Sequence, residues 1–178
     1  MDELTRLAIK YGTDKWGKHK YTPVYHQMFK NRRAGSDVDY VENVLEIGVG
    51  EGASLFMWRD YFFKAHIYGL DNDFYRVFKA EAITVFLGDQ SNGEDLERVM
   101  KSALTFDLII DDGSHDPKHQ LDTCLKLMSM LNTDVTYVIE DVDDKCVDQI
   151  KKGLKNYDVK EYHVGSRHDD RLIVVRHK

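Results

Sequence analysis

The order of apolar and polar runs predicts strands that alternate with helices from residue 41 onward. Apolar runs of strand length lie at residues 43–47, 65–70, 83–87, 106–110, 135–139, 157–164 and 172–176. Apolar residues recur at helical spacing after residue 52 and in residues 94–104, 117–131 and 143–154. Strands separated by helices indicate a mostly parallel sheet. The last two strands are joined by a loop too short for a crossover helix, so we expect them to pair antiparallel.

The first forty residues follow a different pattern. Residues 2–11 have apolar side chains at helical spacing and are followed by Gly12, a common helix terminator. Residues 23–30 begin with proline and predict a second helix. The intervening loop is rich in glycine, aromatic and charged residues, and we interpret it as a lid over a polar ligand. The alternative is a loop whose aromatic rings only pack beneath it. The polar stretch 31–37 predicts a linker.

Taken together, these elements predict a single α/β domain over residues 1–178. It consists of N-terminal helices and a lid in residues 1–40, followed by an α/β core in residues 41–178. The length of 178 residues agrees with one domain. The expected core has a mostly parallel seven-stranded sheet with one antiparallel strand and with helices on both faces.

Composition narrows the class of protein. The hydrophobic content of 42% and the charged content of 31% are ordinary for a folded globular chain. The formal net charge of −6 argues against a nucleic-acid partner bound through phosphate contacts. Residues 1–12 contain no apolar core of signal-peptide length, and no apolar run approaches the roughly 20 residues of a membrane span, so we expect a cytoplasmic protein. Cys124 and Cys146 are expected to be reduced thiols.

A glycine-rich loop joins the strand at 43–47 to the following helix. Gly48, Gly50 and Gly52 stand where a tight turn needs unusual backbone angles and where a ligand approaches the main chain. Asp71 ends the next strand and is placed to accept hydrogen bonds from two ribose hydroxyls, unless it only caps a helix. The pattern fits a site for either NAD or S-adenosylmethionine.

Two further acidic positions favour S-adenosylmethionine over NAD. Glu46 precedes the glycines, and Asp89 with Gln90 follows the strand at 83–87. We therefore predict these three residues, together with the three glycines and Asp71, as cofactor contacts.

Acidic residues also follow two other strands. Asp111 and Asp112 end the strand at 106–110 and His115 comes soon after them, while Glu140 and Asp141 end the strand at 135–139. The carboxyl ends of parallel strands meet at one edge of a sheet, and carboxylates that converge there repel one another unless a cation lies between them. The sequence thus predicts a divalent metal with a histidine beside it. The alternatives are an exposed turn histidine and a carboxylate pair that caps a helix.

These motifs resemble a known enzyme family. EIGVGEG at residues 46–52, Asp71 and the pair Asp89-Gln90 are similar to motifs of class I S-adenosylmethionine-dependent methyltransferases. More narrowly, YGTDK at residues 11–15, DDGSH at 111–115 and ED at 140–141 resemble the macrocin and mycinamicin sugar O-methyltransferases. The resemblance spans roughly residues 7–145 and implies a Rossmann-like class I methyltransferase fold.

The resemblance implies a metal-dependent mechanism. Mg²⁺ would be held by Asp112, Glu140 and Asp141, in keeping with its preference for oxygen ligands. His115 would act as the general base on a hydroxyl of a rhamnose-like sugar or another glycan, because histidine accepts protons near neutral pH. Successive strand residues point to opposite faces, so we assign Asp112 to the metal and Asp111 to the cofactor side.

The remaining candidates surround this centre. We predict Thr13 and Lys15 as cofactor contacts from the lid, and Tyr21 and His119 as acceptor contacts. For His119 the alternative is a place on a half-buried helix face. The last polar turn, which contains residues 168–170, is expected to be solvated.

Other functions stay open at the level of sequence. One is an O-methyltransferase for a catechol-like or other small vicinal diol. A second is an NAD-dependent oxidoreductase or epimerase, which predicts that the pocket binds nicotinamide. A third is a non-catalytic cofactor-binding module of a glycan-assembly complex. The expected partner is a small-molecule or glycan acceptor, and a homo-oligomer or a fusion to a glycosyltransferase is also compatible with the sequence.

Overall fold

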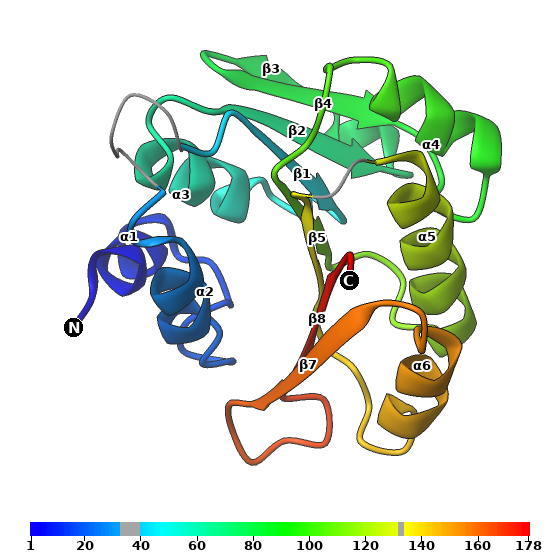
Figure 1. Ribbon diagram of the computed structural model, residues 1–178. Coiled ribbons are helices and arrows are strands. Elements are labelled where there is room, and N and C mark those ends of the chain that lie inside the picture. The colour runs from blue at the N-terminus through cyan, green and yellow to red at the C-terminus, as the bar shows by residue number, and fades with distance from the viewer. Residues whose placement is uncertain (33–39, 132–133) are drawn as a thin grey trace.

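The computed structural model describes residues 1–32, 40–131 and 134–178, and in these ranges a sheet of eight strands lies between two layers of helices (Figure 1). The strands are β1 Asn43–Ile47, β2 His66–Asp71, β3 Lys79–Ala80, β4 Ile83–Leu87, β5 Leu108–Asp111, β6 Thr136–Ile139, β7 Asp158–His163 and β8 Arg171–Arg176. Their order across the sheet is β3-β4-β2-β1-β5-β6-β8-β7. Most of the linker predicted at 31–37 lies outside the described residues.

Helices cover both faces of the sheet. They are α1 Glu3–Tyr11, α2 Thr22–Phe29, α3 Ala53–Tyr61, α4 Gly93–Met100, α5 Pro117–Met130 and α6 Val147–Gly153, and a single 3₁₀ turn, η1, spans Phe74–Arg76. Helices α1, α2 and α3 lie on one face, and α4, α5 and α6 lie on the other (Figure 1). None of the helices in the described ranges is long and apolar enough to cross a membrane.

Strands β5, β6 and β8 are buried on both sides of the sheet because they are apolar at nearly every position. In β5, Leu108 and Ile110 pack into the core beneath α1, α2 and α3, whereas Ile109 packs into the core beneath α4, α5 and α6. Successive strand side chains point to opposite faces, so an uninterrupted apolar run packs into the cores on both faces of the sheet.

The sheet topology confirms the predicted mixed α/β class and adds one strand to it. Strand β8 runs antiparallel to both β6 and β7, as expected for the last pair. Strand β3 also runs antiparallel to its neighbour, β4, through only two paired positions. Two residues are too few to show an alternating pattern, which is why the sequence does not reveal β3.

Helix limits follow local capping chemistry. The Asp2 side chain accepts a hydrogen bond from the backbone of Thr5 at the start of α1, and Gly12 ends that helix in the left-handed region at φ 72°. Helix α4 ends at Met100 instead of the predicted residue 104, and α6 begins at Val147 instead of 143. The chain from Gly12 to Tyr21, hereafter the lid segment, lies between α1 and α2.

Candidate active site

The glycine loop packs tightly against the end of β5. Gly48 has φ 84°, and a Cβ atom built on it would lie 2.1 Å from the backbone oxygen of Asp112. Gly52 has φ 80° and precedes the first turn of α3. The backbone N–H groups of Val49 and Gly50 donate to Oδ2 of Asp71, at 2.8 and 3.3 Å. Glycine at position 48 is therefore required by the close approach of two backbones.

A first cavity of about 290 Å³ lies on one side of Gly48. Its walls include Asp71, Asp89, Gln90 and His119. The cavity combines carboxylates with an amide side chain, which are groups that recognise ribose hydroxyls and a purine edge. This side of Gly48 suits the adenosine half of a nucleoside cofactor.

A second cavity of about 390 Å³ lies on the other side of Gly48. The lid segment and the glycine loop both contribute to its walls. The lining residues are Gly12, Thr13, Asp14, Lys18, Gly48, Val49, Gly50, Glu51, Ala53, Ser54, Asp112, His115 and Asp141. Because the two cavities share Gly48, they suit an elongated ligand whose reactive end faces the acidic residues and the histidine.

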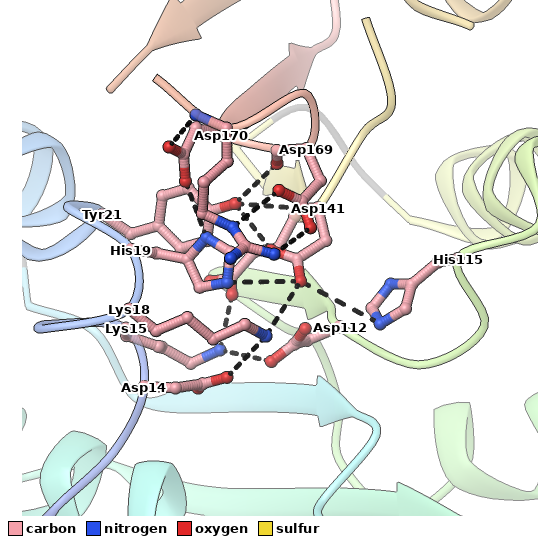
Figure 2. Close-up of polar contacts among 12 residues, drawn as sticks. Asp14, Lys15, Lys18, His19, Tyr21, Asp112, His115, Asp141, Asp169 and Asp170 are labelled. Atoms are coloured by element: carbon pink, nitrogen blue, oxygen red, sulfur yellow. Dashed lines mark hydrogen bonds and ion pairs between the residues drawn. The ribbon is translucent and has the colours of Figure 1, made fainter. Parts of the chain in front are cut away.

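Three side chains form a compact group in the second cavity. Asp112, His115 and Asp141 each offer a ligand atom within 4.8 Å of the others, and His115 Nε2 lies 4.0 Å from Asp141 Oδ2. Figure 2 shows His115 facing Asp112 and Asp141 from the side opposite the lid segment. Asp141 has φ 52°, a left-handed conformation that is uncommon outside glycine. Such backbone strain at a side-chain cluster is typical of functional sites.

The lid segment holds the Asp141 carboxylate. The Tyr21 hydroxyl donates to Asp141 Oδ1 at 2.6 Å, and His19 Nε2 lies 3.6 Å from Asp141 Oδ2. Burial raises the pKa of Asp141, the Tyr21 hydrogen bond opposes this effect, and the Asp112 charge adds to it. On its other side, His19 Nδ1 is 2.9 Å from Asp170 Oδ1.

A buried lysine lies beside this group. The Lys15 ammonium contacts Glu140 at 2.6 Å, Asp112 at 2.8 Å and Glu46 at 3.0 Å. Burial alone lowers the pKa of Lys15, but the three carboxylate charges outweigh burial and raise that pKa well above its ordinary value. Both oxygens of Glu140 have a partner, since Oε1 accepts from Tyr25 and Oε2 from Lys15. Burial, reinforced by the neighbouring carboxylates, raises the pKa of Glu140.

The chemistry of these donors fits a hard divalent cation. Burial raises the pKa values of Glu46, Glu140 and Asp141, and in each case the charge of Asp112 contributes in the same direction. The described residues thus show an excess of negative charge that Lys15 and Lys18, the latter 3.9 Å from Asp141, only partly balance. Carboxylate oxygens suit Mg²⁺, and a bound cation would remove their repulsion. Asp112 and Asp141 point into the cavity, whereas Glu140 would have to share an oxygen with Lys15.

Several predicted contacts lie behind the cavity walls. Glu46 is fully buried and accepts from the indole of Trp58, Lys15 is 1% exposed, and Asp111 is completely buried. Asp111 accepts from Gln90 and Tyr137, so it supports the cofactor side through Gln90 and does not face the cavity. These three residues are close to the predicted site, but their side chains do not line it.

Tyr21 and His119, the two predicted acceptor contacts, do not lie where an acceptor contact was expected. Tyr21 is fully buried with its hydroxyl on Asp141, so it orients a carboxylate. His119 Nδ1 pairs with Ser114 Oγ at 3.0 Å, and His119 lines the first cavity. His119 is therefore closer to the expected adenosine side than to the acceptor side.

Asp170 and its partner His19 are not predicted from the sequence, because the residues around each of them are polar. Asp170 was expected to be solvated, but it is 3% exposed. Its carboxylate accepts from the backbone of Arg167 and contacts the buried His19 ring. No local pattern signals this burial, since the partner lies 151 positions away in the chain.

The titration of Asp111 makes the stability of the folded protein depend on pH. Burial raises its pKa to about 7, against the opposing hydrogen bonds from Tyr137 and Gln90. An unfolded aspartate titrates near 3.9, so the stability contributed by neutral Asp111 is complete below about pH 4 and is lost as the pH rises through about 7. Urea unfolding of the metal-stripped protein at pH 5 and pH 8 should show most of this loss, with an upper bound of about 3 kcal/mol between those two pH values. Asp111→Asn should reduce it, whereas the exposed Asp122→Asn should not.

Asp170 and Asp169 allow a fully buried acid to be compared with a partly buried one in the same turn. Asp170→Ala would leave His19 Nδ1 buried without its partner, and should lower the free energy of unfolding by about 2 kcal/mol. Asp169→Ala removes a carboxylate that pairs with the half-exposed side chain of Arg167, and should cost less than about 1 kcal/mol. Equal losses in urea unfolding would contradict the assigned role of Asp170.

Comparison with known proteins agrees with this geometry. A rhamnosyl tetracenomycin-C 2'-O-methyltransferase of Streptomyces olivaceus is 35% identical over 146 residues, which cover 78% of this chain. Demethylmacrocin O-methyltransferase of Streptomyces fradiae is 35% identical over 148 residues, which cover 79% of this chain. The chain is a homologue of the macrocin- and mycinamicin-type sugar O-methyltransferases. It spans 37% and 36% of the length of these two relatives.

The chain also shares the fold of a sugar methyltransferase whose structure has been solved. The mycinamycin-pathway methyltransferase MycE, in complex with Mg, SAH and mycinamycin VI, superposes with a TM-score of 0.81 at 28% identity. That comparison covers 99% of this chain and 53% of MycE. No family model matches the chain. The class I methyltransferase fold predicted from the sequence is thereby confirmed.

Proposed function

We propose that this chain catalyses S-adenosylmethionine- and Mg²⁺-dependent methylation of a sugar hydroxyl. The observation that carries the proposal is the pair of cavities meeting at Gly48, with Asp112, His115 and Asp141 grouped at the far end of the second. The names of the relatives support it, since one is a 2'-O-methyltransferase of a rhamnosyl tetracenomycin-C and the other is a demethylmacrocin O-methyltransferase. The MycE complex with Mg and SAH supports the same pair of cofactors.

The cofactor would lie along the two cavities. Asp71 would accept from the ribose, and Asp89 and Gln90 would contact the adenine end. Gly48 and Gly50 would let the cofactor approach the main chain, and Thr13 would close the methionine end from the lid segment. The predicted contacts that lie behind the walls, Glu46, Lys15 and Asp111, would shape this pocket without lining it.

The metal would be held by carboxylates at the acceptor end. Asp112 and Asp141 would be ligands, and Glu140 would join them by sharing its Oε2 atom with Lys15. When bound, Mg²⁺ would supply Lewis-acid chemistry that lowers the pKa of an acceptor hydroxyl. Tyr21 would keep Asp141 in its left-handed, inward-facing conformation.

His115 would serve as the general base. Its side chain is 55% exposed at the mouth of the second cavity, within reach of an incoming acceptor. The hydroxyl oxygen would form a bond to the methyl carbon while the carbon–sulfur bond breaks, and the hydroxyl proton would pass to the His115 ring. Among the described residues that line this wall of the cavity, no other side chain has both the exposure and the basicity that the transfer requires.

Two other functions remain as alternatives of the proposal. A metal held by these carboxylates could bind two adjacent hydroxyls of a catechol-like diol as well as those of a sugar. A non-catalytic cofactor-binding module would keep the cavities but would not need Asp112 or His115. Cytoplasmic location, a homo-oligomer and a fusion to a glycosyltransferase stay predictions of the sequence.

Acceptor profiling separates these alternatives. The purified protein would be given S-adenosylmethionine, Mg²⁺ and either a rhamnoside or a catechol, and S-adenosylhomocysteine would be quantified. We expect S-adenosylhomocysteine to form with the rhamnoside at a rate well above that with the catechol. Preference for the catechol would favour the small-diol alternative, and cofactor binding without product from any acceptor would favour the non-catalytic module.

A further inference from the structure

The lid segment sends one charged side chain into the interior of the protein. Lys15 is 1% exposed, and lysine is almost never buried to this extent unless it is paired. Its ammonium group contacts three carboxylates at 2.6, 2.8 and 3.0 Å. Those carboxylates belong to Glu46 in β1, Asp112 after β5 and Glu140 after β6, three strands that are adjacent in the sheet. A single side chain thus bridges the lid segment to the ends of three neighbouring strands.

We propose that Lys15 is a positioning residue that fastens the lid segment over the second cavity and holds Asp112 in place beside Asp141. The inference rests on the proposed function for the use of Asp112 as a metal ligand. It assigns a role to a residue that lines neither cavity, in place of the cofactor contact predicted from the sequence.

The residues around Lys15 explain why its position matters. Thr13 and Asp14 precede it and Lys18 follows it, and all three line the second cavity. The lid segment is folded on itself, since the backbone N–H of His19 donates to Asp14 and that of Tyr21 donates to Lys15. Figure 2 shows Lys15 reaching from this loop to Asp112. Loss of the Lys15 contacts would therefore loosen the part of the wall around Asp14 and Lys15, whose carbonyls accept from His19 and Tyr21. The side chains of Tyr21 and His19 would still hold the far end on Asp141 and Asp170.

Lys15 affects the metal site in two opposing ways. Its positive charge repels a cation that binds to Asp112, so its removal would tighten metal binding if charge alone mattered. Its contacts also draw Asp112, Glu46 and Glu140 together, and without it these carboxylates would repel one another and move apart. The 2.8 Å contact to Asp112 fixes a ligand directly, as a residue behind a metal ligand does. We expect this ordering to dominate.

Lys15→Met tests the inference, with Lys20→Met as the matched control. Lys20 lies in the same lid segment but is exposed, with its ammonium over the ring of Trp16. Hydrogen exchange of the metal-free protein should be about tenfold faster at the His19 and Tyr21 amides of Lys15→Met, and unchanged in β1 and β5. Titration with Mn²⁺ alone, followed by its paramagnetic resonance spectrum, should show an affinity about 10- to 100-fold weaker. Lys20→Met should match the wild type in both.

Two outcomes would overturn the inference. One is lid exchange in Lys15→Met within about twofold of the wild type. The other is an Mn²⁺ affinity that is unchanged or tighter, since tighter binding would make Lys15 a competitor of the metal. If Lys15→Met does not fold, Glu46→Gln weakens the same contact while keeping an acceptor for Trp58, and lid exchange should rise about threefold. Unchanged lid exchange in a folded Glu46→Gln variant would equally contradict the role of Lys15.

These measurements separate the inference from the proposed function. Hydrogen exchange and Mn²⁺ binding require no methyl transfer, so they can succeed even if the wild type proves inactive on every acceptor. Conversely, an active wild type with an unaltered lid in Lys15→Met would refute the inference alone.

Discussion

Replacing His115 with alanine should lower the rate of methyl transfer by about 10²- to 10⁴-fold, which is the usual contribution of a general base. The reason is its place at the mouth of the second cavity, with Nε2 4.0 Å from Asp141 Oδ2. The binding of S-adenosylmethionine should change little, because His115 lies at the mouth of the second cavity and is not among the residues proposed to hold the cofactor. Single-turnover formation of S-adenosylhomocysteine, with calorimetric binding measured in parallel, checks both expectations.

His168→Ala is the matched control for this variant. His168 is exposed in the turn between β7 and β8, and it lines neither of the two cavities. Its replacement should leave the rate within about twofold of the wild type. A His115→Ala rate equally close to that of the wild type would remove His115 from the mechanism.

Gly48→Ala should destabilise the protein by about 3 kcal/mol or more, because two independent constraints act on one position. An added Cβ would lie 2.1 Å from the Asp112 oxygen and 2.7 Å from the Cα of Gly113, and both neighbours are backbone. The φ of 84° also disfavours any L side chain. The end of β5 would have to move, and Asp112 and the cavity beside it would move with it. Urea unfolding and S-adenosylmethionine binding should both report the loss.

Gly50→Ala separates the two constraints. Gly50 also has a positive φ, 52°, but an added Cβ would meet nothing within 4 Å. Only the backbone cost should remain, about 1–2 kcal/mol. If both variants unfold at the same urea concentration, the close approach of Gly48 to Asp112 does not limit the fold.

The fold was predictable because its signals are local. Long apolar runs followed by turn residues mark each buried strand, and β5 and β6 appear within two residues of their predicted limits. The two-residue strand β3 is the exception. It forms by pairing with β4, and its own two residues show no strand pattern.

The candidate site was only partly predictable, because its contacts join distant segments. The sequence indicates that Asp112, His115 and Asp141 converge at one edge of the sheet, and the structure groups them there. It does not indicate that Lys15 is buried against carboxylates more than 90 positions away, as in its contact with Asp112. The same limit applies to the His19–Asp170 pair. Residue type and spacing identify which groups are near the site, but packing decides which of them face the cavity.

The most direct test of the account is titration of the metal-stripped protein with S-adenosylmethionine, followed by addition of Mg²⁺ and a rhamnose-containing glycoside. The account predicts that the protein binds S-adenosylmethionine, that S-adenosylhomocysteine forms only after Mg²⁺ is added, and that a chelator stops its formation. Failure to bind S-adenosylmethionine, or product formation that is indifferent to metal removal, would contradict it.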